Sequence, residues 1–162
     1  MKKWLIALLG SAALATSAGA LAQKQQAGTG FYIGGDVGNA DFGNDDDTSI
    51  KILGGYQINR NFAAEVGYSQ LFDKGGAEVT AFELVGVGMY PLGNQFSLLG
   101  KLGLARINVD TAAGSRDKTE LTFGVGVQYD LNPKFGLRGQ WQRYDTDPDS
   151  VDVLSIGVIY KF

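Results

Sequence analysis

The sequence predicts an all-β fold, an eight-stranded antiparallel up-and-down transmembrane β-barrel, and three observations predict it. Apolar and polar residues alternate through most of the chain after residue 22, as in strands with one apolar face. A short aromatic-flanked turn motif occurs three times between these stretches. A segment with the features of an export signal precedes them. Together these observations indicate one exported domain that crosses a membrane with strands.

Residues 1–22 have the layout of a cleaved secretory signal peptide. Lys2 and Lys3 precede an apolar stretch, and small residues follow it up to Ala22. The apolar stretch is too short for a membrane-spanning helix. We therefore expect cleavage after Ala22 and a single barrel domain over residues 23–162.

Eight stretches have the alternation of strands, and the last shows it most clearly. Its apolar face carries Leu154, Ile156, Val158, Tyr160 and Phe162, and its other face carries Ser155, Gly157, Ile159 and Lys161. The expected strands cover residues 30–38, 49–57, 62–70, 79–90, 96–106, 119–129, 135–144 and 151–162. Each is close to the ~9–11 residues with which a tilted strand crosses a bilayer.

The connections between these strands are of two kinds. Three short turns share a pattern of two aromatic residues around five others, in Tyr56–Phe62, Tyr90–Phe96 and Tyr129–Phe135. Four longer polar connections lie near residues 39–48, 70–79, 106–119 and 144–151. Outer-membrane barrels have short periplasmic turns and long extracellular loops, so we expect this orientation.

Aromatic residues on the apolar face favour a membrane barrel over a soluble one. They gather at the short-turn end as an interface girdle, comprising Tyr56, Phe62, Tyr90, Phe96, Tyr129 and Phe135 together with Tyr160 and Phe162. Amphipathic rings prefer the membrane interface. The alternative is a soluble periplasmic lipocalin-like binder with an apolar cavity.

Charged residues also fall on the inward face of the predicted strands. They are Asp36, Lys51, Glu65, Glu83, Lys101, Glu120 and Arg138. Unpaired charges inside a narrow barrel are costly, so we expect a lumen ion-pair network that plugs the barrel. Glu65 and Arg138 should lie at the same depth and pair. Lys101 and Asp36 should lie about one layer higher, with Glu83 within reach of Lys101.

The composition excludes several classes of function. The chain contains neither histidine nor cysteine, which removes Ser-His-Asp and Cys nucleophilic catalysis, disulfides, and His- or Cys-ligated metals. The net charge of −3 becomes −5 without Lys2 and Lys3, so nucleic acid is not an expected partner. There are acidic loops at 45–47 and 145–149, of which the second matches a calcium loop incompletely, and solvated surface loops are the default expectation. We expect no catalytic site, cofactor or metal.

Three segments resemble the transmembrane domain of the OmpA-type outer-membrane proteins. They are GGYQINRNFAAEVGY (54–68), GVQYDLNPKFGLRGQWQ (126–142) and LSIGVIYKF (154–162). The resemblance implies an eight-stranded barrel in the bacterial outer membrane, with Glu65 and Arg138 in the lumen network. Family members tend to have a basic residue where Asp36 stands and an acidic one where Gln128 stands, so the network is expected to be rewired. Larger members carry a C-terminal peptidoglycan-binding domain, which the sequence does not include, so we assign no wall-anchoring role.

The C-terminal segment matches the assembly signal of outer-membrane proteins. Its components are Ser155, Gly157, Tyr160 and Phe162. The expected partners are therefore the barrel-assembly machinery and periplasmic chaperones, with recognition by strand pairing. Outer-membrane lipid and lipopolysaccharide are the other expected partners. Basic residues near the loop end are either contacts for the lipopolysaccharide phosphates or ordinary loop-end charges, namely Arg106, Arg116, Lys118 and Arg143.

The expected function is a structural, envelope-integrity or surface-interaction role for a monomeric outer-membrane barrel, as the resemblance implies. A small low-conductance pore and the soluble lipocalin-like binder are the alternatives.

Overall fold

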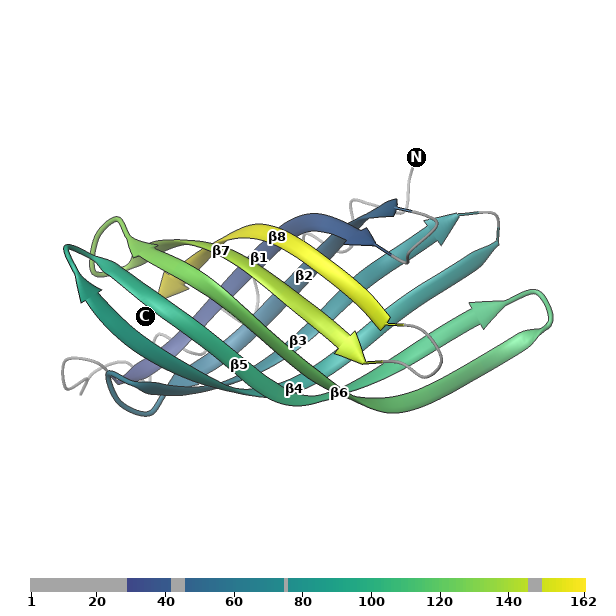
Figure 1. Cartoon of the computed structure of the whole chain (residues 1–162), viewed down its shortest axis with the longest axis horizontal. Coiled ribbons are helices and arrows are strands. Elements are labelled where there is room, and N and C mark those ends of the chain that lie inside the picture. Colours follow the sequence, from purple (N-terminus) through teal and green to yellow (C-terminus); the bar gives the residue numbers. More distant parts are fainter. Residues whose placement is uncertain (1–28, 42–45, 75, 146–149) are drawn as a thin grey trace.

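A computed structural model describes residues 29–41, 46–74, 76–145 and 150–162, and the expected signal peptide of residues 1–22 lies outside them. Eight antiparallel strands follow one another in chain order and close into one barrel, in which β1 also pairs with β8 (Figure 1). The strands are β1 (Gly30–Asp41), β2 (Asp46–Gln57), β3 (Phe62–Lys74), β4 (Ala77–Gly93), β5 (Phe96–Thr111), β6 (Gly114–Asp130), β7 (Phe135–Asp145) and β8 (Ser150–Lys161). No helix among the described residues is long and apolar enough to cross a membrane. The predicted fold class is confirmed.

The repeated turn motif has a local cause at two of its three sites. The side-chain oxygen of Asn59 accepts hydrogen bonds from the backbone N–H groups of Asn61 and Phe62, at 2.8 and 2.9 Å. Asn132 makes the same two bonds in the β6–β7 turn, both at 2.8 Å. Asparagine side chains commonly close turns in this way. The motif therefore encodes one turn geometry, used twice.

The β4–β5 connection is tighter than the five-residue turn that we expected over Tyr90–Phe96. β4 continues to Gly93, and only Asn94 and Gln95 connect it to β5, with φ angles of 48° and 71°. Positive φ at both central residues is the geometry of a two-residue hairpin turn. Gly93 occupies the place of Asn59 in the motif, and glycine has no side chain to close the wider turn.

The expected loop over residues 106–119 is instead a hairpin. β5 and β6 stay paired as far as Thr111 opposite Gly114, so their ends project beyond the rest of the barrel (Figure 1). The β6 arm of this projection is exposed on both faces from Gly114 to Thr119, so it lacks the apolar pattern of a half-buried strand. On the β5 arm, Ile107 is buried and Val109 packs against the apolar cluster at the loop end. The expected loop over residues 70–79 is also mostly strand, with a bulge between Gln70 and Phe72.

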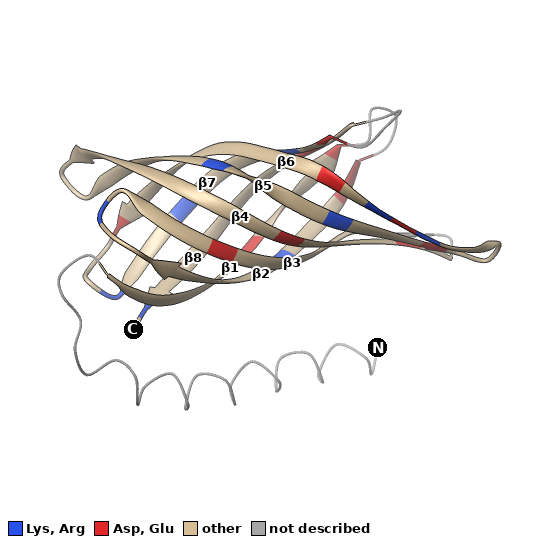
Figure 2. Ribbon diagram, turned by 90° about the horizontal axis from the view of Figure 1, so that it is seen from below, with Lys and Arg blue, Asp and Glu red and all other residues tan. Residues whose placement is uncertain are grey.

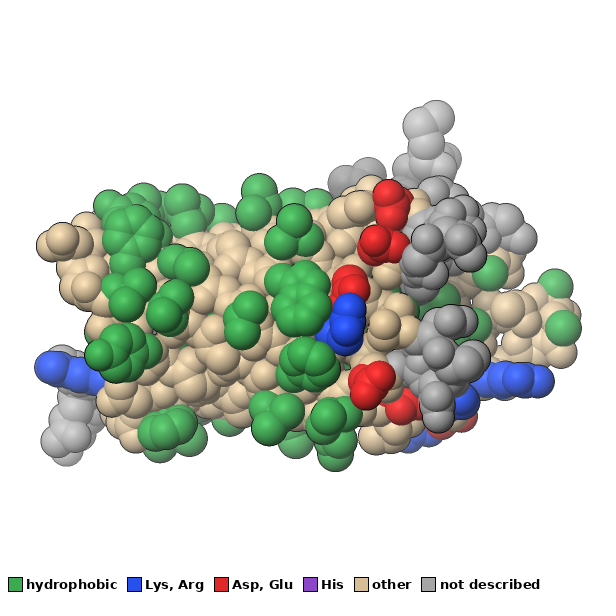
Figure 3. Space-filling view, in the orientation of Figure 1, with side chains coloured by type: hydrophobic (Ala, Val, Ile, Leu, Met, Phe, Trp, Pro, Cys, Tyr) green, Lys and Arg blue, Asp and Glu red, His purple; other side chains and the backbone are tan. Residues whose placement is uncertain are grey.

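The distribution of side chains is the reverse of that in a soluble protein, with apolar residues on the outer surface and polar residues in the interior. The outer surface carries large exposed hydrophobic residues such as Leu154 and Ile156, which are 66% and 70% exposed, and charged groups gather toward its ends (Figure 3). Polar and charged side chains occupy the interior between two buried apolar clusters. This arrangement suits lipid outside and a filled lumen inside. It argues against the soluble lipocalin-like alternative, which needs an apolar cavity.

Candidate functional site: the polar core of the barrel

Six of the seven predicted lumen charges lie inside the barrel. They come from six different strands and are at most 5% exposed: Asp36, Lys51, Glu65, Glu83, Lys101 and Arg138. Three are acidic and three are basic, so their formal charges cancel. Figure 2 shows charged positions midway along the strands, apart from the charges at the two ends. Burial without charge balance would be very unfavourable, and the set is therefore best treated as one unit.

Glu65 on β3 is the centre of the first cluster. One carboxylate oxygen accepts hydrogen bonds from Arg138 Nη1 at 2.6 Å and from the Tyr32 hydroxyl at 2.7 Å. The other oxygen accepts from Lys101 Nζ at 2.7 Å. Each partner comes from a different strand, β1, β5 or β7. Side chains from alternate strands therefore meet in one layer, as is usual inside small barrels.

Glu83 on β4 is the centre of the second cluster. Its carboxylate accepts hydrogen bonds from Lys51 Nζ at 2.8 Å, Gln142 Nε2 at 2.7 Å and the Tyr144 hydroxyl at 2.8 Å. Gln142 also accepts from Lys51 at 2.7 Å and donates to the Thr122 hydroxyl at 2.9 Å. Four strands contribute to this cluster, β2, β4, β6 and β7.

The pairing inside the lumen differs from our expectation for Glu83. Its ion-pair partner is Lys51, whereas Lys101 reaches Glu65. The register of β4 and β5 explains the difference, because Lys101 lies opposite Val87 and Glu83 lies opposite Ala105. The two charges are thus four residues apart along the hairpin, roughly 13 Å of strand.

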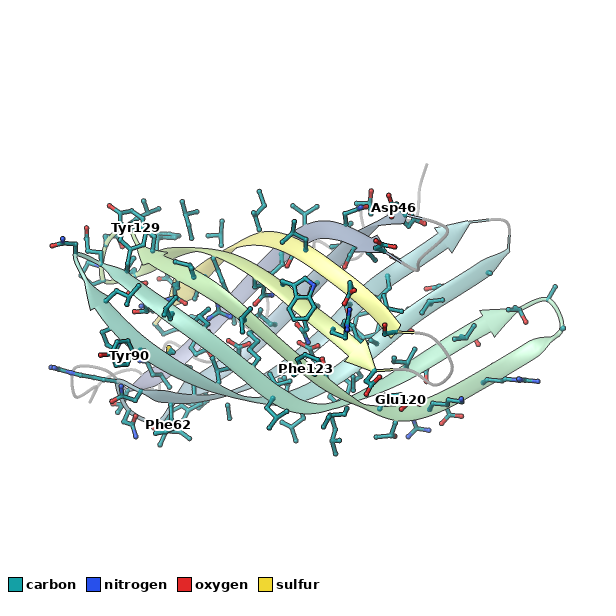
Figure 4. All side chains as sticks on the ribbon, in the orientation of Figure 1. Asp46, Phe62, Tyr90, Glu120, Phe123 and Tyr129 are labelled. Atoms are coloured by element: carbon teal, nitrogen blue, oxygen red, sulfur yellow. The ribbon has the colours of Figure 1, made fainter. Side chains whose placement is uncertain are left out.

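Glu120 does not join this network. Its side chain is half-buried toward the loop end of β6 (Figure 4), and no ion pair involving it occurs among the described residues. Strand alternation gives the face on which a residue lies but not its depth, and Glu120 lies nearer the loop end than the buried charges do. The interior charge therefore balances without it.

Gln128 extends the first cluster toward the short-turn end. It accepts hydrogen bonds from Arg138 at 2.9 and 3.3 Å, and its amide nitrogen donates to Asp130 at 2.8 Å. Asp130 in turn pairs with Lys161 at 2.8 Å. Because Gln128 is neutral, it accepts hydrogen bonds from the Arg138 guanidinium without replacing Glu65 as the ion-pair partner of that group.

Asp36 spans the seam where the first and last strands meet. It lies opposite Gly157 on β8, and a β-carbon at position 157 would stand 1.8 Å from its Oδ1 atom. Its other carboxylate oxygen accepts a hydrogen bond from Gln140 Nε2 on β7, at 2.6 Å. The side chain thus reaches across β8. Asp36 Oδ1 and Gln140 Oε1 are the buried side-chain polar atoms that lack a partner among the described residues.

The predicted girdle residues gather at the short-turn end, where Figure 4 labels Phe62, Tyr90 and Tyr129. Neighbouring rings touch in pairs, with centroids 4.7 Å apart for Phe96 and Tyr129 and 5.1 Å apart for Phe135 and Tyr160. A second group of partly or largely exposed aromatic residues nearer the loop end was not identified from the sequence, and comprises Tyr68, Phe82, Phe123 and Trp141. Two aromatic belts are expected when a barrel crosses two interfaces.

The predicted assembly-signal residues occupy β8 and the residue after it. Ser155 faces the interior, Gly157 lies under Asp36, and the rings of Tyr160 and Phe162 are 5.1 Å apart. The backbone N–H of Phe162 donates to the carbonyl of Phe31 at 3.0 Å. The segment is therefore paired on both sides once the barrel has closed.

Acidic partners are found for Arg143 and Arg106, which are among the four basic residues predicted near the loop end. Arg143 makes a two-point contact with Asp152, at 2.6 and 2.7 Å, and Arg106 pairs with Asp117. Within the described residues near this end, acidic side chains outnumber basic ones. The acidic loop at 45–47 lies partly, and the one at 145–149 mostly, outside the described residues.

A closed eight-stranded barrel with an apolar exterior, aromatic belts and a charged interior belongs to the class of bacterial outer-membrane β-barrels. Within this class, the chain is a member of the outer membrane protein beta-barrel domain family, which it matches over residues 9–162. The predicted resemblance and location are thus confirmed.

Two relatives are named outer membrane protein A. The protein from Escherichia coli O157:H7 is 28% identical over 192 residues, covering 100% of this chain and 55% of its own length. The protein from Klebsiella pneumoniae is 27% identical over 171 residues, covering 89% of this chain and 49% of its own length. This chain thus spans about half the length of the curated relatives that it matches.

Solved structures share the fold at low sequence identity. The N-terminal β-barrel domain of Pseudomonas aeruginosa OprF has a TM-score of 0.65 at 14% identity, covering 83% of this chain and 99% of that one. Yersinia pestis Ail has a TM-score of 0.59 at 18% identity, covering 83% and 97%. Neisserial surface protein A has a TM-score of 0.58 at 23% identity, covering 82% and 97%.

Proposed function

We propose that this outer-membrane barrel has a structural or surface-contact role in the envelope, without steady ion conduction and without catalysis. The observation that carries the proposal is the filled polar core. Its six buried charges are at most 5% exposed and are held mainly by one another and by buried Tyr and Gln side chains. An ion crossing the lumen would have to displace these contacts. A small low-conductance pore is therefore the less favoured alternative.

Conductance of the purified barrel in planar lipid bilayers tests this proposal. The wild-type protein should give negligible steady current. A matched control replaces Glu65, Lys101 and Arg138 with serine, which empties the first cluster while leaving the second intact. If this variant folds, its current should exceed that of the wild type. Sustained large channels in the wild type would instead support the pore.

The proposed absence of catalysis rests on the residue inventory. The outer-membrane enzyme PagL shares the fold, with a TM-score of 0.56 at 12% identity, but a likeness of this kind concerns the fold alone. With no histidine or cysteine, this chain has neither an imidazole base nor a thiol nucleophile. Incubating the purified protein with lipopolysaccharide and phospholipids should release no acyl chains.

The projecting β5–β6 hairpin supports the surface-contact role, because it presents side chains beyond the rim of the barrel. One structure of Ail was determined with a heparin analogue. At 18% identity this likeness concerns the fold alone, so we do not propose that ligand class here. Lipopolysaccharide remains a proposed partner through the loop-end cations. A deletion strain should show altered cell-surface binding or envelope stress, and a hairpin-truncated copy should restore envelope integrity but not binding.

A further inference from the structure

We propose that the outer surface of β3, β4 and β5 binds an anionic phospholipid of the periplasmic leaflet, a site that goes beyond the structural role above. A groove of about 500 Å³ lies there near the short-turn end. Its lining includes Asn61, Phe62, Gly88, Tyr90, Leu98 and Gly100. The groove is shallow and open, so a lipid would lie along it with one side still facing the membrane.

Two glycines form the floor of the groove. Gly88 and Gly100 lie opposite each other across β4 and β5. A β-carbon added at Gly100 would meet no atom within 4 Å, and one added at Gly88 would meet only a backbone oxygen at 3.9 Å. The neighbouring Phe62 and Tyr90 are 59% and 67% exposed and provide the walls. The missing side chains thus leave an apolar channel among large residues, which suits a hydrocarbon chain.

A positively charged residue directly precedes Asn61 of the groove lining in the sequence. Arg60 is exposed in the β2–β3 turn, two residues before Phe62, and has no acidic partner among the described residues. Asn61 ties this turn to β4 by donating a hydrogen bond from its side chain to the Met89 carbonyl, at 3.1 Å. The turn is therefore fixed beside the groove, and the exposed Arg60 guanidinium in this turn is free to extend toward a phosphodiester.

The charge of the short-turn end favours an anionic headgroup. Among the described residues there, Asp130 is the one acidic side chain, and Lys161 already pairs with it. Arg60 and Lys134 remain as excess positive charge. The aromatic girdle places this end at the level of the headgroups, where the membrane itself supplies both a phosphate and an acyl chain. A glycerophospholipid with net negative charge fits both parts of the site.

The test uses the folded barrel in vesicles of equal phosphatidylcholine and phosphatidylglycerol, extracted in mild detergent, with retained lipids counted by native mass spectrometry. The wild type should retain phosphatidylglycerol in preference to phosphatidylcholine. Arg60→Gln should reduce this preference about fivefold, the typical effect of one basic residue at an anionic surface. Gly100→Leu should fill the groove and reduce retention of both lipids. Arg116→Gln, a charge change in the projecting hairpin, should have no effect.

Folding of every variant is first verified by its heat-modifiable gel shift, and Gly88→Leu replaces Gly100→Leu if the latter does not fold. Equal retention of the two lipids by the wild type would overturn the proposal. Unchanged preference in Arg60→Gln would also overturn it, as would unchanged retention in a folded groove-filled variant. None of these outcomes depends on whether the lumen conducts ions.

Discussion

Replacing Arg138 with methionine should destabilise the barrel by about 3 kcal/mol. Removing one partner of a buried ion pair costs roughly 3–5 kcal/mol, because the other charge remains buried. Glu65 would lose its 2.6 Å contact but would keep Lys101 and Tyr32. The expected loss therefore lies at the lower limit of that range. Methionine has a volume close to that of the arginine stem, which limits the effect of a cavity.

Urea unfolding in lipid vesicles, followed by gel mobility, measures this loss. With slopes of about 1–3 kcal/mol per molar urea, the midpoint should fall by roughly 1–3 M. Arg106→Met is the matched control, since Arg106 pairs with Asp117 on the exposed hairpin, where both side chains are more than half exposed. An exposed pair contributes at most about 1 kcal/mol. Equal midpoints for the two methionine variants would refute the buried-pair reasoning.

Three further predictions concern the seam, the orientation and assembly. Gly157→Ala should reduce the folded fraction on gels, because the added carbon would lie 1.8 Å from Asp36. Combining it with Asp36→Ala should restore only part of the yield, since a backbone oxygen would still lie 2.6 Å from that carbon. Full rescue by the double variant would contradict this geometry. Trypsin added to intact cells should cut after Arg116 and spare Arg60, and the reverse pattern would invert the proposed orientation. Deleting Phe162 should lower insertion into outer membranes, and wild-type yield would argue against the assembly signal.

The strand number, the strand order and the facing of side chains were predictable because each depends on local sequence. Alternation with a period of two residues identifies a half-buried strand from that strand alone. The Asn59 turn was predictable for the same reason, since its closing hydrogen bonds join residues within three positions.

The remaining features depend on relations between strands that one sequence does not contain. The partner of Glu83 follows from the stagger of the closed barrel, which decides the depths at which side chains meet. The β6 arm of the projecting hairpin is exposed on both faces from Gly114 to Thr119, so that strand has no alternating signal there. The Asp36 side chain packs over Gly157, which joins the first and last strands, and only barrel closure brings these two residues together. The second aromatic belt could have been found, because Phe123 and Trp141 each lie six residues from a predicted girdle ring on the same strand face.

The Glu65 cluster also has a mechanical consequence for the shape of the barrel. Backbone pairing joins only neighbouring strands, so a closed sheet held by this pairing alone could flatten until its cross-section is an ellipse. Glu65 links β1, β3, β5 and β7 across the interior, although these strands are not neighbours, and these links brace the cross-section of the barrel. Lateral pressure from the bilayer would have to stretch these short contacts in order to deform the cross-section. The barrel should thus keep a nearly constant girth as the surrounding membrane thickens, thins or bends.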